Sequence, residues 1–179
     1  MLKNAKPQIA VFTVYGALLV GIPVAAAVET SVNKPDTVTV STIDPLDKYK
    51  GATELTNVEL ADLLSLVGFE GKSLKLAWAI VMRESRGHPT SLNNNSSTGD
   101  HSYGLFQINM IGSLGETRRE KFGITKNAEL LDPVTNAKAA YYMSNHGKDF
   151  SSWGLGPNAY DGTPSEPAVT KWLADFPKA

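Results

Sequence analysis

The chain has 179 residues, of which 17 are basic, 18 are acidic and 42% are hydrophobic. Its formal net charge of −1 gives no general positive field, so we expect no nucleic-acid partner. Cysteine is absent, which excludes thiol nucleophiles, thiolate zinc sites and disulfides. The three histidines lack the i, i+4 spacing of a helical ligand pair, so we predict no metal site and no cofactor. The side chains that remain available for catalysis are therefore carboxylates and hydroxyls.

Residues 1–28 are predicted to be a cleaved export signal or an uncleaved membrane anchor. Lys3 and Lys6 precede an uncharged apolar run over residues 9–28, and a bilayer span needs roughly 17–25 such residues. The small residues Ala25–Ala27 are typical of a signal cleavage site at their end. In both alternatives the lysines stay inside, so we expect an extracytoplasmic protein, either secreted or anchored to the cytoplasmic membrane.

The composition then changes twice along the chain. Residues 29–52 are rich in Thr, Val, Ser, Asp and Pro and have little helical periodicity, which predicts an extended linker. Residues 53–179 remain as a single globular unit, which is long enough to bury a core without disulfides.

Start and stop signals predict five helices in this unit. Thr56 with Glu59 three residues later forms a capping box. Asp132-Pro133 is another strong start, because aspartate caps a helix and proline suits its first position. Strand signals are scarce, so we predict a mostly α-helical domain with few or no strands. The helices are expected to begin near Thr56, Ser73, Ser113, Asp132 and Thr163, and the first three to end before Gly68, Gly87 and Gly123.

Glu84 is the leading candidate for catalysis. Helical spacing puts it on the same face as Ala77, Ile80 and Val81, which should point inward. An apolar setting and the negative end of the helix dipole would both raise the pKa of this carboxyl group. A protonated glutamic acid near neutral pH can act as a general acid.

Two arginines close to Glu84 could oppose this effect. Arg83 and Arg86 lie one and two residues away and are expected to face elsewhere on the helix. The alternative that spacing alone allows is a partly exposed Glu84 paired with Arg86.

Three motifs follow one another in the globular unit. They are Glu-Ser at 84–85, Ser-Tyr-Gly-Leu-Phe-Gln at 102–107, and Asn-Ala-Lys-Ala-Ala-Tyr at 136–141. In this order they resemble the lysozyme-like lytic transglycosylase family, which includes soluble lytic transglycosylases and goose-type lysozymes. The resemblance extends from about residue 54 to residue 153 and implies a lysozyme-like helical fold.

Two further features bear on the type of family member. The ending Phe150-Ser151-Ser152-Trp153 resembles lysozyme-like domains of phage tail and virion proteins, so both a bacterial and a viral origin stay open. Many family members carry a late Ala-Tyr-Asn motif, and its nearest counterpart, at residues 158–160, reads Asn-Ala-Tyr. That altered order leaves the far wall of the cleft undefined.

The resemblance implies that Glu84 is catalytic and that residues of the three motifs bind substrate. The Ser85 hydroxyl would orient the carboxylate, and the Gln107 amide would pair with an acetamido group. Gly104 would let the backbone approach a sugar, although a turn glycine is an equal alternative. The predicted substrate-binding residues are Ser85, Ser102, Tyr103, Gly104, Gln107, Asn136 and Tyr141.

Aromatic and basic side chains are weaker candidates. Aromatic residues at helical spacing belong more often to a core, so at most two or three should touch ligand. The aromatic candidates are Tyr103, Phe106, Tyr141, Tyr142 and Trp153. The basic residues Arg118, Arg119 and Lys121 are expected to form a solvated face, with contact to an anionic cell-wall polymer as the alternative.

The implied substrate is the glycan strand of peptidoglycan, cleaved between N-acetylmuramic acid and N-acetylglucosamine. In the implied reaction Glu84 acts alone, first as general acid and then as base, and leaves an anhydro-muramic end. A hydrolytic muramidase is the alternative, with Glu84 as acid and Asp100 as base, although Asp100 after Gly99 also fits a turn. A non-catalytic wall-binding or virion-assembly module is a further alternative.

Overall fold

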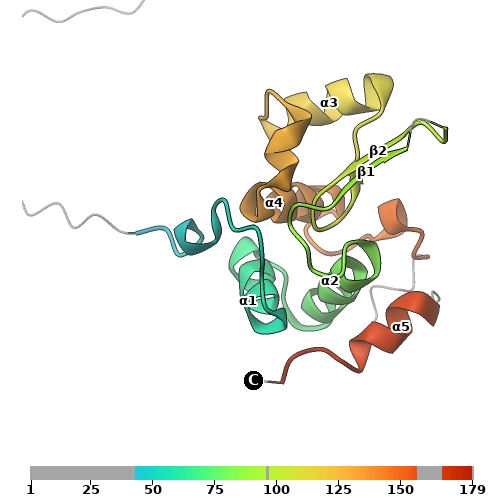
Figure 1. The fold of residues 1–179 in the computed structure, drawn as a ribbon. Helices are drawn as coiled ribbons and strands as arrows, with labels where there is room; N and C mark the ends of the chain where they lie inside the picture. Colours follow the sequence, from blue (N-terminus) through green and yellow to red (C-terminus); the bar gives the residue numbers. More distant parts are fainter. Residues whose placement is uncertain (1–42, 96, 157–166, 179) are drawn as a thin grey trace, which may run out of the picture. The chain divides into compact units, whose positions relative to one another are not determined.

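A computed structural model describes residues 43–95, 97–156 and 167–178. Figure 1 shows a mostly helical body with a small sheet, which confirms the predicted helical class. The α-helices are α1 (Asn57–Val67), α2 (Gly71–Glu84), α3 (Gly112–Phe122), α4 (Pro133–Met143) and α5 (Pro167–Leu173). The 3-10 helices are η1 (Asp47–Tyr49), η2 (Asn127–Leu131) and η3 (Ser151–Trp153). The strands are β1 (Leu92–Asn95), β2 (Asp100–Tyr103) and β3 (Ile108–Asn109).

Several predictions fall outside the described residues. They are the signal or anchor at 1–28, the linker up to residue 42, the motif at 158–160, and the predicted start of the last helix at Thr163. Within the described ranges, no helix combines the length and the apolar character that crossing a membrane requires.

The predicted helix caps are present. The Thr56 hydroxyl accepts a hydrogen bond from the Glu59 backbone N–H at 3.2 Å, and the Glu59 carboxylate accepts one from the Thr56 N–H at 2.8 Å. At the start of α4, Asp132 accepts from the backbone N–H of Thr135 at 2.8 Å. Each cap satisfies backbone donors that have no partner within the helix. These capping signals therefore fix where α1 and α4 begin.

Helix α2 forms the centre of the body. Every residue from Leu76 to Met82 is buried, on all sides of the helix. It packs against α1 and α5, and the buried indole of Trp78 donates to the Asn57 carbonyl of α1 at 3.2 Å. Because the middle of α2 is enclosed, its last residue, Glu84, emerges from the core rather than from an exposed surface.

The sheet is antiparallel, in the order β1-β2-β3. Leu92 pairs with Tyr103 and Asn95 with Asp100. Strand β1 contains three consecutive asparagines, and no strand was predicted for these residues. All four β1 residues are exposed, so the strand shows no alternation of apolar and polar side chains. Backbone pairing and the bond from the Asn93 amide to Asp100, at 2.8 Å, hold it in place.

The folded body includes the end of the predicted linker. Leu46 and Tyr49 are buried in the core, before the boundary expected at residue 53. The Tyr49 hydroxyl and the Lys48 ammonium each lie 2.7 Å from the Asp62 carboxylate of α1. The hydrogen bond from Lys48 is the main reason why the pKa of Asp62 is below its usual value, and the bond from Tyr49 lowers this pKa further. Because the composition of this segment is polar, the sequence did not indicate that two of its residues belong to the core.

Candidate active site

A cleft of about 340 Å³ lies at the carboxyl end of α2 and contains Glu84. Its walls come from parts that are far apart in the sequence. Residues of α2, the Gln107–Asn109 segment, α3, the end of α4 and η3 all line it. Glu84 is thus the last residue of a helix with a buried middle, and its side chain lines this cleft.

The Glu84 carboxylate is paired with Arg83, contrary to the expectation that this arginine faces elsewhere. Arg83 donates to Glu84 Oε1 from Nε at 2.9 Å and from Nη2 at 2.6 Å. Nη2 also donates to the Trp153 carbonyl at 2.7 Å. Successive Cβ atoms diverge on a helix, but the long arginine side chain bends back to its neighbour. The Glu84 carboxylate thus has a charged hydrogen-bond partner on its own helix, which the sequence interpretation did not assign to it.

Arg86 was the alternative partner of Glu84, and it lies elsewhere. Its guanidinium carbon is 4.8 Å from the ring centroid of Trp172 on α5. The Glu84 side chain is 24% exposed and that of Arg83 is 20% exposed. The pair is therefore half-buried at the edge of the cleft, where solvent and substrate can both reach the carboxylate.

Glu84 is the only carboxylate among the described residues that line this cleft. Asp100, the suggested second acid, is not one of the lining residues. Its carboxylate accepts hydrogen bonds from Asn93 at 2.8 Å, Ser102 at 2.6 Å and Asn109 at 3.2 Å. Asp100 thus connects the three strands, which occupies the oxygens that a catalytic base would use.

Gln107 lies in the cleft, as the resemblance implied. Its backbone has a φ of +46°, in the left-handed region. The side-chain nitrogen donates to the carbonyl of Gly104 at 2.9 Å and to that of Ser91 at 3.2 Å. These two bonds fix the amide, whose oxygen accepts no hydrogen bond from the described residues. A fixed acceptor of this kind suits the N–H of an acetamido group.

Asn136 and Gly104 build the wall behind the cleft rather than its surface. Asn136 is fully buried, and its amide donates to the carbonyls of Tyr103 at 2.9 Å and Leu130 at 2.8 Å. Its oxygen accepts from the Phe106 backbone N–H at 2.9 Å. A Cβ on Gly104 (φ +73°) would lie 2.2 Å from the Asn136 nitrogen and from the Leu130 carbonyl oxygen. The close approach that requires this glycine is therefore made by the protein itself.

The other predicted substrate-binding residues do not line the cleft either. The Ser85 hydroxyl donates to a carbonyl one turn earlier in α2, at 3.2 Å, and not to Glu84. Ser102 is buried and donates to Asp100. Tyr141 packs edge-on against the buried Phe69, with ring centroids 5.0 Å apart. The motifs do meet in space, but most of their side chains are structural.

Two of the five aromatic candidates face a pocket. Trp153 lines the Glu84 cleft, and its indole N–H donates to the Phe106 carbonyl at 2.9 Å. Tyr142 is 51% exposed and lines an adjoining pocket. Phe106 is fully buried. Trp153 and Tyr142 are therefore the aromatic candidates that the two pockets near Glu84 expose to a ligand.

Arg118, which was expected to belong to a solvated basic face, lines the cleft from α3. Its guanidinium donates to the Asn109 carbonyl, and burial lowers the pKa of this side chain. Arg119 instead donates to Asn127 at 2.7 Å, away from the cleft. The signal was present, because Leu114 and Arg118 are four residues apart and share one helical face. The predicted basic patch is therefore divided between two faces of α3.

A family model described as a lysozyme-like domain matches residues 61–155, which is more than half of the chain. No curated protein and no solved structure matches the chain. The described residues contain no cluster of three side chains that could hold a metal ion. Matched residues include the whole of α2 and every residue that lines the cleft. The chain belongs to the lysozyme-like lytic transglycosylase family.

Proposed function

We propose that this protein is a peptidoglycan lytic transglycosylase that uses Glu84 as its single acid and base. Family membership indicates cleavage of peptidoglycan. The observation that supports a mechanism with a single carboxylate is that Glu84 is the only carboxylate lining the cleft in the described part of the chain. Most hydrolytic glycosidases need a second carboxylate at about 5–9.5 Å from the first.

In this proposal Glu84 first protonates the oxygen that leaves N-acetylmuramic acid. The neighbouring acetamido group of the sugar stabilises the positive ring carbon. Glu84, now a carboxylate, then takes the proton of the sugar's own primary hydroxyl, whose oxygen closes an anhydro ring. The proton balance is complete, Glu84 ends protonated, and no water is consumed.

Arg83 has a defined part in this cycle. Its two hydrogen bonds to Oε1 stabilise the carboxylate that exists between the two proton transfers. Positioned acid–base transfer supplies roughly 100- to 10,000-fold of rate enhancement. The rest must come from distortion of the sugar and from stabilisation of its charge in the cleft.

The products distinguish transglycosylase from hydrolase. Purified peptidoglycan is digested with the protein, and the muropeptides are analysed by mass. We expect anhydro-muramic ends. Reducing ends would refute the single-Glu route and favour the hydrolytic muramidase, in which a second acid such as Asp100 activates water.

Replacing Glu84 by Gln removes the proton but keeps the size of the side chain, so we expect cleavage to be abolished and the fold to be kept. Asp100→Asn is the matched control, because the amide oxygen can still accept the hydrogen bonds of Ser102 and Asn109, and only the exposed bond from Asn93 is lost. The control should retain cleavage with unchanged products. Retained activity in Glu84→Gln would place the acid elsewhere.

A non-catalytic wall-binding or virion-assembly module is the alternative from another class. A zymogram with embedded peptidoglycan separates the two, since a binding module leaves no cleared band. Immunodetection in purified phage particles would identify a virion component whose activity assists entry.

We propose that the protein acts outside the cytoplasm, either secreted or held in the membrane through residues 9–28. The apolar run and the small residues near its end support this location. N-terminal sequencing of exported protein tests it: a new terminus after Ala27 indicates a cleaved signal, and an intact terminus in the membrane fraction indicates an anchor. Protein found only in the cytoplasm would contradict both.

A further inference from the structure

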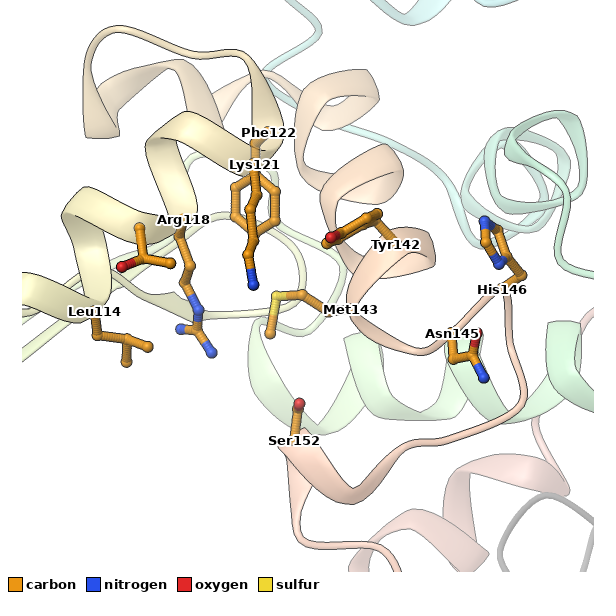
Figure 2. A pocket seen from close by; sticks show the side chains of 10 residues that line it. Leu114, Arg118, Lys121, Phe122, Tyr142, Met143, Asn145, His146 and Ser152 are labelled. Carbon is orange, nitrogen blue, oxygen red and sulfur yellow. The ribbon is translucent and has the colours of Figure 1, made fainter. Parts of the chain in front are cut away.

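A second pocket, of about 450 Å³, adjoins the Glu84 cleft. The two share four lining residues, which are Leu114, Arg118, Met143 and Ser152. Figure 2 shows this second pocket between α3, the end of α4 and the segment that carries Ser152. Because the walls are shared, one extended ligand can occupy both spaces.

The second pocket is positively charged. Arg118 and Lys121, three residues apart on α3, both extend into the space beside Met143 (Figure 2). None of its described lining residues is acidic. Within the described ranges, neither cation forms an ion pair. A half-buried guanidinium without a carboxylate partner loses solvation that an anionic ligand would replace.

The same pocket also offers apolar contact surface. Tyr142 and Phe122 lie edge-to-face, with ring centroids 6.3 Å apart. Leu114 is 44% exposed and Met143 is partly buried. The lining therefore suits a ligand that combines carboxylates with short aliphatic groups.

We propose that this pocket binds the peptide carried by the muramic acid of the strand, through the carboxylates of that peptide. This inference rests on the proposed function, since it assigns a second part of the same substrate. Sugar hydroxyls are neutral and give no reason for two unpaired cations, whereas peptide carboxylates match them. The pocket is next to the cleft, as a peptide attached to a bound sugar requires.

The test measures binding rather than turnover. Glu84→Gln protein is titrated with a disaccharide-peptide fragment of peptidoglycan and with the same disaccharide without peptide. We expect the peptide-bearing fragment to bind about tenfold more tightly. Lys121→Gln in this background should reduce the ratio of the two dissociation constants about threefold. Adding Arg118→Gln should remove the remaining preference.

Arg119→Gln is the matched control, because Arg119 is on the same helix but does not line the pocket, so its loss should leave the ratio unchanged. Equal affinity for the two fragments, or an unchanged ratio in Lys121→Gln, would overturn the proposal. Lys121-dependent binding of a phosphate-rich wall polymer without any peptide preference would overturn it in favour of that polymer. A wild-type protein that shows the preference but never cleaves would refute the proposed function and leave the peptide site standing.

Discussion

The guanidinium of Arg83 holds two groups at once, the Glu84 carboxylate and the Trp153 carbonyl. It thereby attaches the end of α2 to η3 across the cleft. A carboxylate held in this way has a fixed orientation, which general acid–base transfer requires.

Replacing Arg83 by Met should slow cleavage. We expect the rate to fall about tenfold, because the hydrogen bonds that orient Glu84 are lost. Initial rates of cleavage of purified peptidoglycan test this. Arg86→Met is the control, and a rate equal to wild type in Arg83→Met would refute the orienting role.

At the scale of elements, the turn between β2 and β3 positions Gln107 through Gly104 and Asn136. We expect Gly104→Ala to destabilise the fold by about 3 kcal/mol, because its Cβ would overlap backbone and amide atoms in addition to straining φ. Gly123→Ala is the matched control, since Gly123 has a similar φ of +66° and open space around it. Its cost should be only about 1 kcal/mol. Denaturant unfolding measures both, and equal losses would contradict the packing argument.

The helices could be predicted from the sequence because their signals are local. Capping residues and a stop glycine lie within one helix length, as at Thr56 and Gly68. Strand β1 could not be predicted, since its exposed asparagines depend on pairing with β2. Helical spacing placed Glu84 at the inward end of its helix, and the resemblance carried by the three motifs singled it out as the catalytic candidate. Asn136 was predicted to bind substrate, but its amide is hydrogen-bonded within the protein. Two of its partners lie 30 and 33 residues away in the sequence, so only the fold shows these bonds.

At the scale of the whole molecule, hydrogen bonds from Lys48 and Tyr49 to Asp62 hold the segment before α1 against the body. The lowered pKa of Asp62 means that the folded state prefers the charged carboxylate. This contribution is present above the unfolded pKa, about 3.9, and is lost as pH falls through the lower folded value. Wild type should therefore lose more stability than Asp62→Asn on acidification below about pH 4. Unfolding free energies at neutral and acidic pH test this, and equal losses would contradict it.

The placement of Trp153 has a practical consequence. The chain has three tryptophans, and Trp78 is enclosed in the core while Trp172 lies on α5 under Arg86. Trp153 alone among them lines the Glu84 cleft. The fluorescence emission of its indole should therefore change when saccharide displaces water beside it. Occupancy of the groove can then be followed in the unlabelled protein, in real time and without any chemical turnover.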